Sequence, residues 1–170
     1  MPGPMGVRDA VEGDAAAIAR IWNEGIEDRN ATFETEPRGS DRIEAWMRGK
    51  AARYPTVVVE ADGRVIAWAA ASEYHPRECY AGVGEFSVYV ERAARGRGAG
   101  RLAMQALIAA SERAGLWKLV SRVFPENVAS LALLRSLGFR EVGTYRRHAK
   151  LDGTWRDVVI VEKLIGEGDR

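Results

Sequence analysis

The sequence predicts a single domain of the α+β kind of α/β fold, in which about four helices cover a mixed sheet of about seven strands. The main observation is a strand-like run at 86–90, followed at once by a glycine-rich turn and by a segment with helical periodicity at 102–114. A second observation is Asp62-Gly63, a dipeptide typical of tight hairpins, between two strand-like runs. The length of 170 residues is that of one domain, and we expect its core to span about residues 7–164.

Two helices and three strands are expected in the first half of the chain. The first helix runs from Asp14, a residue type that favours helix N-caps, to before Asn30. The second runs from 41 to 53 and is stopped by Pro55. The stretch 30–40 is too polar and too interrupted for a core element, so it predicts a loop. Strands are expected over residues 7–8, 56–60 and 64–72.

The second half of the chain begins with an irregular polar loop over 73–84, and loops carried by rigid strands often contact ligands. Beyond the helix at 102–114 we expect a strand, a short helix and two last strands, over 116–123, 127–137, 140–147 and 155–164. The last two strands are joined by a turn at Asp152-Gly153. The tail after Ile165 is expected to be loose.

The composition indicates no strong overall electrostatic field. With 25 basic and 24 acidic residues the net charge is +1, so neither nucleic-acid nor membrane binding is expected. Cys79 is the only cysteine, which excludes an internal disulfide, and with only His75 and His148 beside it no metal site is expected. No apolar run reaches the roughly 18 residues of a membrane span, and residues 1–6 lack the basic and apolar blocks of a signal peptide. We therefore expect a cytoplasmic protein.

The glycine-rich turn predicts an anion site. Gly96, Gly98 and Gly100 carry no Cβ, so backbone N–H groups there can approach a bound group closely. The turn precedes a helix N-terminus, which carries about half a positive charge and favours phosphate. A turn with solvated arginines is the alternative. The arginines around the turn are Arg92, Arg95, Arg97 and Arg101.

Two common phosphate motifs do not fit this turn. A P-loop needs a Gly-Lys-Ser/Thr run that the chain lacks, and a dinucleotide fingerprint needs a small residue where Arg101 stands. The turn instead satisfies the pattern Gln/Arg-x-x-Gly-x-Gly/Ala through Arg95, Gly98 and Gly100. It thereby resembles motif A of the GNAT superfamily of N-acetyltransferases. The resemblance implies that this loop holds the pyrophosphate of acetyl-CoA.

Over about residues 7–164 the chain resembles the phosphinothricin acetyltransferase group of that superfamily, which includes arsinothricin-resistance enzymes. The resemblance rests on 32–37, Arg77, Tyr80, Glu85, 87–90, Asn127, Ser130, 137–139, Gly153, Trp155 and Asp157. It implies the GNAT fold, acetyl-CoA as co-substrate and no metal. The residues implied to contact acetyl-CoA are Val88, Tyr89, Val90, Arg95, Gly96, Arg97, Gly98, Ala99, Gly100, Arg101, Asn127 and Ser130.

The resemblance also implies the catalytic roles. Glu85 matches the glutamate that the group uses as a base, although a solvated strand end is the alternative from the residues alone. The main-chain N–H at Val88 would polarise the thioester carbonyl. Leu134 stands where many members have a tyrosine or a histidine, so water, Tyr89 or Ser130 is left to protonate the leaving thiolate. No histidine lies near Cys79 in a sequence position that would activate it, so direct transfer is expected.

The implied acceptor is the α-amino group of a small amino acid analogue such as phosphinothricin, arsinothricin, methionine sulfone or methionine sulfoximine. An arginine fork suits the carboxylate or phosphinate of such a molecule. A homodimer is also implied, with Trp155 and Asp157 near its interface. Two alternatives stay open, namely acetylation of a protein N-terminus or another amine, and a non-catalytic CoA-binding module. The expected substrate contacts are Phe33, which could instead be a core aromatic, Arg77, Tyr80 and Ser87.

Overall fold

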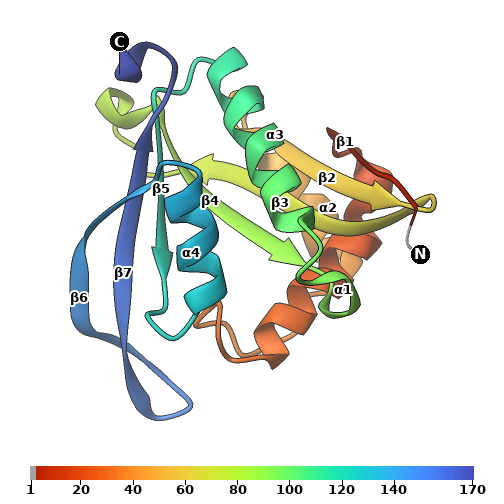
Figure 1. The fold of residues 1–170 in the computed structure, drawn as a ribbon, viewed down its shortest axis with the longest axis horizontal. Helices are drawn as coiled ribbons and strands as arrows, with labels where there is room; N and C mark the ends of the chain where they lie inside the picture. The colour runs from red at the N-terminus through yellow and green to blue at the C-terminus, as the bar shows by residue number, and fades with distance from the viewer. Residues whose placement is uncertain (1–2) are drawn as a thin grey trace.

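The computed structural model describes residues 3–170, which form a seven-stranded mixed sheet with helices on both faces (Figure 1). Residues 1–2 lie outside the described residues. They belong to the stretch 1–6, in which no signal peptide was expected. The strands are β1 Met5–Asp9, β2 Thr56–Ala61, β3 Arg64–Glu73, β4 Val83–Val90, β5 Lys118–Val123, β6 Arg140–Leu151 and β7 Thr154–Leu164. The helices are α1 Ala15–Glu27, α2 Ser40–Gly49, α3 Ala99–Arg113 and α4 Val128–Ser136. The predicted fold class is confirmed.

The sheet has the order β1-β2-β3-β4-β5-β7-β6, and only the β4–β5 pair is parallel. The helices α3 and α4 cover one face, in front of the sheet in Figure 1, and α1 and α2 cover part of the other face. Successive side chains of a strand point to opposite faces, so the central strands supply both cores. Trp68 of β3, for example, is fully buried against Trp22 of α1 and Tyr89 of β4, with ring centroids 4.8 and 5.1 Å apart.

The two parallel strands separate near the middle of β4. Their pairing runs only from Val83 opposite Lys118 to Glu85 opposite Val120. One residue later the Ser121 hydroxyl donates a 2.8 Å hydrogen bond to the carbonyl oxygen of Phe86, which ties the strands where they begin to part. Beyond that point α4 covers the gap between the strands, and its Leu134 side chain is buried. The end of β4 therefore has strand β3 on one side and no strand on the other.

Several boundaries differ from the expected ones. The helix α3 begins at Ala99 rather than at Leu102, because Gly98 has a φ of +88° and turns the chain directly into the helix. The helix α2 ends at Gly49 rather than at 53, since Lys50 already has extended backbone angles. Strand β6 reaches Leu151 instead of 147, because it pairs with β7 as far as the turn. The C-terminal tail contains a 3-10 turn, Gly166–Asp169, instead of being loose.

Asp14 precedes α1 as expected, but its side chain does not cap that helix. Its carboxylate instead accepts hydrogen bonds from the Val11 N–H at 2.8 Å and from the Arg8 guanidinium at 2.8 and 2.9 Å. The Arg8 hydrogen bond, more than the other contacts, holds the pKa of Asp14 below its ordinary value. The carboxylate therefore stabilises the β1–α1 connection.

The loops around β4 also contain short 3-10 turns that were not expected, at Glu78–Tyr80 and Arg92–Ala94. Among residues 3–170, no helix combines the length and the apolar character that crossing a membrane requires. In the same residues no three His, Cys, Asp or Glu side chains are placed to hold a metal ion together.

Candidate active site

A cleft of about 970 Å³ lies at the carboxyl end of β4, between the end of α1, the glycine-rich turn and α4. All residues predicted from the sequence to contact the cofactor line it, except Arg97, whose side chain is exposed. The structure thus brings together residues from three separate segments. Those lining the cleft are Val88, Tyr89, Val90, Arg95, Gly96, Gly98, Ala99, Gly100, Arg101, Asn127 and Ser130.

The glycine-rich turn presents backbone donors to this cleft. Gly96 and Gly98 have φ values of +77° and +88°, which a residue with a side chain adopts only under strain. The first hydrogen bond of α3 joins the Leu102 N–H to the Gly98 carbonyl oxygen, so the N–H groups of the preceding residues have no partner within the helix. A Cβ on Gly100 would lie 3.3 Å from the Leu133 side chain and 3.4 Å from the Val90 side chain, so both would have to shift by a few tenths of an ångström to admit it. Free amides at a helix N-terminus suit a phosphate group.

Two of the arginines around the turn are already paired with Asp28, the residue that directly follows α1. Arg95 lies 2.7 Å from the Asp28 carboxylate and also donates to the Val90 carbonyl oxygen at 3.2 Å. Arg92 donates to Asp28 at 2.8 Å. Burial opposes the ionisation of Asp28, but the hydrogen bonds from Arg92 and Arg95 outweigh it, and the pKa of Asp28 is lowered. These two arginines therefore fix the turn to the end of α1, and the groups left to hold an anion in the cleft are the backbone donors and Arg101.

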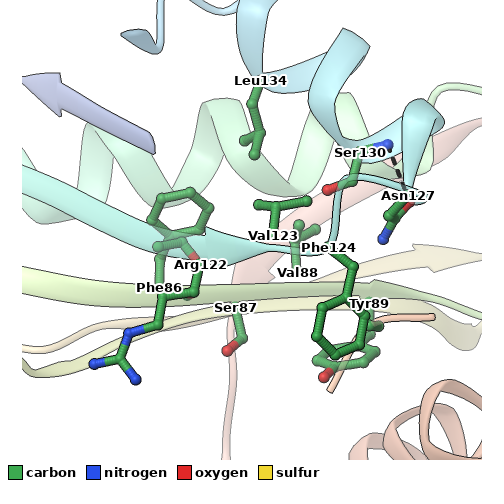
Figure 2. A pocket seen from close by; sticks show the side chains of 12 residues that line it. Phe86, Ser87, Val88, Tyr89, Arg122, Val123, Phe124, Asn127, Ser130 and Leu134 are labelled. Atoms are coloured by element: carbon green, nitrogen blue, oxygen red, sulfur yellow. Dashed lines mark hydrogen bonds between the residues drawn. The ribbon is translucent and has the colours of Figure 1, made fainter. Parts of the chain in front are cut away.

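A smaller cavity of about 60 Å³ lies in the gap between β4 and β5, beneath Leu134 (Figure 2). It shares Val88, Tyr89, Asn127 and Ser130 with the large cleft, so the two spaces adjoin. The Asn127 side-chain oxygen accepts a 3.3 Å hydrogen bond from the Ser130 N–H, and this bond caps α4. This cap positions the start of α4 against the gap.

The main chain of Val88 points into this gap. Within a strand, the N–H and C=O of one residue share a direction that alternates from residue to residue. The Phe86 carbonyl points toward β5, where Ser121 donates to it, and the Val90 carbonyl accepts from Arg95 on the same side. Val88, midway between them, has the same direction. Because β5 no longer pairs there, its N–H is available to a ligand.

Glu85 lies on the sheet face opposite α4, together with Ser87, because both alternate with the buried Phe86. Its carboxylate has no hydrogen-bond or ion-pair partner among residues 3–170, and it borders neither of the two cavities. Glu85 and Val88 are three positions apart, which corresponds to about 10 Å along the strand. A proton would therefore reach Glu85 from the Val88 region through an intervening water molecule.

The predicted acceptor contacts are spread over two places. Arg77 and Tyr80 lie in the loop before β4, at the end opposite the glycine-rich turn, and within the described chain they border neither cavity. Tyr80 packs against the rings of Tyr74 and His75, with centroids 5.8 and 5.2 Å away. Phe33 instead packs edge to face on Phe124, 4.9 Å away, on the sheet face that carries Ser87. The roles of these residues stay predictions.

The two side chains considered as proton donors to a thiolate differ in position. The Tyr89 ring is stacked under β4 on Trp68, and burial, followed by the charge of Glu34, raises the pKa of its phenol. In Figure 2 the Tyr89 hydroxyl points away from α4, whereas the Ser130 hydroxyl faces the cavity. Leu134 is buried in the roof and offers no proton. Of the two side chains, Ser130 has the more suitable position.

Sequence reasoning missed the contribution of α1 to the cleft. Asp28, Arg29 and Asn30, which follow α1, line the cleft, and Asp28 pairs with Arg92 and Arg95. The charged residues at the end of this amphipathic helix could have indicated a functional role. The sequence around them does not show that they pair with the glycine-rich turn, which is distant in the chain. Ser121, which ties β4 to β5, has no local sequence signal.

Comparison with known proteins gives three consistent results. The model of the "Acetyltransferase (GNAT) family" matches residues 18–139. An L-methionine sulfoximine/L-methionine sulfone acetyltransferase of Pseudomonas paraeruginosa is 32% identical over 158 residues, covering 92% of both chains. The structure of a phosphinothricin acetyltransferase from Sinorhizobium meliloti in complex with acetyl-CoA aligns with a TM-score of 0.90 and 29% identity, over 96% of this chain and 90% of that one.

A different activity is named for another solved structure. A ribosomal-protein-alanine N-acetyltransferase from Brucella melitensis aligns with a TM-score of 0.90 and 30% identity, over 94% of this chain and 99% of that chain. The same architecture thus occurs with small-molecule and with protein acceptors among the similar proteins.

Proposed function

Because this chain belongs to the acetyltransferase (GNAT) family, we propose that it N-acetylates the α-amino group of a small amino acid analogue, with acetyl-CoA as the donor. The observation that carries this proposal is the gap between β4 and β5, which adjoins a cleft of about 970 Å³ with a glycine-rich helix N-terminus in its wall. The role would be detoxification of, or resistance to, amino acid analogues of the phosphinothricin and arsinothricin type.

Acetyl-CoA would be held by the residues that line the cleft, and the chain's features fit it. The backbone N–H groups at the start of α3 suit its pyrophosphate, and the close approach of Gly100 to Leu133 leaves the turn compact. Asn127 and Ser130 border the passage from the cleft into the gap, where the pantetheine arm would run. When bound, acetyl-CoA supplies the acetyl group as an activated thioester. We assign no role to a metal ion.

The chain's own groups account for the remaining requirements of acetyl transfer. The Val88 N–H, aimed into the gap, would stabilise negative charge on the carbonyl oxygen. Glu85, with no other partner among residues 3–170, would accept the proton of the acceptor amine through water. Ser130, or a water molecule beside it, would return a proton to the leaving sulfur. No covalent enzyme intermediate is required, and Cys79 is exposed on the loop before β4.

We further propose that the protein is a cytoplasmic homodimer that binds neither nucleic acid nor membranes. The net charge of +1 supports the last two points. The dimer is supported by Tyr145 on the edge strand β6 and by Trp155 on its neighbour β7, whose side chains are 53% and 51% exposed. Exposed aromatic residues on an edge strand are unfavourable unless covered.

Acetylation of a protein N-terminus is the second candidate, favoured by the similarity to the Brucella enzyme. Arg77, an exposed cation in the loop before β4, instead favours an acceptor with an anionic group. A non-catalytic CoA-binding module would have no use for the unpaired carboxylate of Glu85 beside the gap.

The decisive experiment is a panel of acceptors scored for CoA release. It would contain phosphinothricin, arsinothricin, methionine sulfone, methionine sulfoximine, a peptide beginning with Ser or Ala, a polyamine and an aminoglycoside. We expect turnover with at least one amino acid analogue and little with the cationic acceptors, which Arg77 would repel. Preference for the peptide would establish the second candidate, and no turnover with any acceptor would favour the binding module.

A further inference from the structure

The open sheet face beside Glu85 carries a second arginine that the sequence did not single out. We infer that Arg122 of β5 binds the α-carboxylate of the acceptor and so determines specificity for amino acids. This inference rests on the proposed function and assigns one end of the acceptor within the same site.

The register of the strands places Arg122 beside Ser87. Glu85 pairs with Val120 at the end of the parallel β4–β5 ladder, and extending this register by two residues sets Arg122 across the gap from Ser87. Both residues line the small cavity in that gap. Ser121 still reaches Phe86 at 2.8 Å, which shows that the strands remain close at this point. In Figure 2 the Arg122 guanidinium and the Ser87 hydroxyl both point away from α4. They therefore occupy the same face as Glu85.

Arg122 is exposed, and no carboxylate among residues 3–170 pairs with it. Two acidic residues flank Val120 on the same face, the unpaired Glu85 of β4 and Glu162 of β7. Glu162 is already engaged by Lys118 at 2.5 Å and by Arg140 at 2.7 Å, and the Lys118 hydrogen bond is the main cause of its lowered pKa. Arg122 thus forms no ion pair within residues 3–170, and its guanidinium is available to a ligand beside the gap.

The other neighbours of Arg122 form an apolar wall. Ile160 of β7 lies directly opposite it in the antiparallel β5–β7 ladder. Ile160 packs with Phe33 and Phe124 in a small cluster on this face. A cation beside an apolar wall suits an amino acid analogue, whose carboxylate would pair with the guanidinium while its side chain packs on the wall.

Geometry favours Arg122 over Arg77 for the carboxylate. In an α-amino acid the amine and the carboxylate are attached to the same carbon, so the carboxylate anchor must lie close to the place of acetyl transfer. Arg122 lies one position from Val88 in the parallel register, whereas Arg77 precedes the start of β4. Strand dimensions place the Cα atoms of Glu85 and Arg122 about 8 Å apart, which leaves room for the amine between the two side chains. Arg77 would then contact the far, phosphinate- or sulfone-bearing end.

The test compares methionine sulfone with its α-carboxamide as acceptors, for the unmodified enzyme and for Arg122→Gln. The unmodified enzyme should favour the acid, and the substitution should raise KM for the acid about 10- to 150-fold. It should leave KM for the carboxamide and the Kd of acetyl-CoA within about twofold. The matched control is Arg113→Gln, an exposed arginine at the end of α3 on the other face of the sheet, which should change none of these values.

Arg122→Lys keeps the charge but loses the guanidinium fork, so it should recover part of the preference for the acid. An unchanged ratio of acid to carboxamide in a folded Arg122→Gln enzyme would overturn the inference and leave the proposed function intact. The same holds if KM for acid and carboxamide rise together, because that indicates a structural effect. No turnover of either compound by the unmodified enzyme would overturn amino acid acetylation itself, and with it this inference.

Discussion

The two ends of β4 are built in different ways. At its carboxyl end the chain passes in one continuous stretch through Val90, the glycine-rich turn and the start of α3, and the groups it offers are mainly backbone amides. Toward its start, the proposed acceptor site would use side chains of β4, β5 and the loop before β4, which come from segments distant in the sequence. The first arrangement suits a donor that does not vary, and the second lets the acceptor change by substitution of a few side chains.

The largest expected effect is at the acceptor end, in the turnover number. Glu85→Gln removes the proposed base while keeping the size of the side chain, so kcat should fall by about 100- to 10,000-fold. Calorimetric titration should give an unchanged acetyl-CoA affinity. Turnover close to that of the unmodified enzyme from pH 6 to 9 would move the role of base to another group.

Arg77→Ala should act on acceptor binding alone. Losing a charge-assisted pair and leaving its partner unpaired should raise KM for phosphinothricin or methionine sulfone about tenfold to a thousandfold. Steady-state kinetics with both substrates varied would measure this. The acetyl-CoA constant should stay the same, and a shift in it would mean that the two ends of β4 are not independent.

At the donor end the effect should come from the backbone. Gly98 has a φ of +88°, so Gly98→Val strains the turn and displaces the start of α3, and the Kd of acetyl-CoA should rise about 5- to 150-fold. Arg92→Ala is the comparison, because Arg92 is held by Glu27 and Asp28, and it should change the Kd little. Equal effects of the two substitutions would contradict a backbone-built donor site.

The smallest effect on activity is expected at Lys50, which lies away from both ends of β4. Its ammonium donates to the Thr56 hydroxyl at 2.7 Å and lies 4.7 Å from the Trp46 ring centroid, and burial lowers its pKa to about 7. An unfolded lysine keeps its proton up to about pH 10.4, so the unfolded chain binds more protons between pH 7 and 10, and the free energy of unfolding should rise with pH in that window. Lys50→Met should lose this rise, seen in melting temperatures, without a change in kcat.

The difference between groups from one continuous stretch and groups from distant segments also explains how much could be predicted from the sequence. The order of elements and the strand–turn–helix unit were predictable, because each depends on residues close together in the chain. The start of α3 at Ala99 was missed, since it depends on the left-handed conformation of Gly98. The parting of β4 from β5, the pairing of Asp28 with Arg95 and the position of Arg122 beside Ser87 all depend on register and packing between distant segments. No local pattern carries that information.

The central claim is that the glycine-rich turn serves donor binding and that Glu85 serves the chemical step. Its most direct test is kcat at saturating acetyl-CoA for the unmodified enzyme, Gly98→Val and Glu85→Gln, with methionine sulfone as the acceptor. A defect confined to donor binding disappears at saturation, whereas the loss of a base does not. We predict that Gly98→Val recovers most of its turnover and that Glu85→Gln stays at least about 100-fold below the unmodified enzyme. Recovery of Glu85→Gln, or a persistent deficit of a folded Gly98→Val enzyme, would contradict the account.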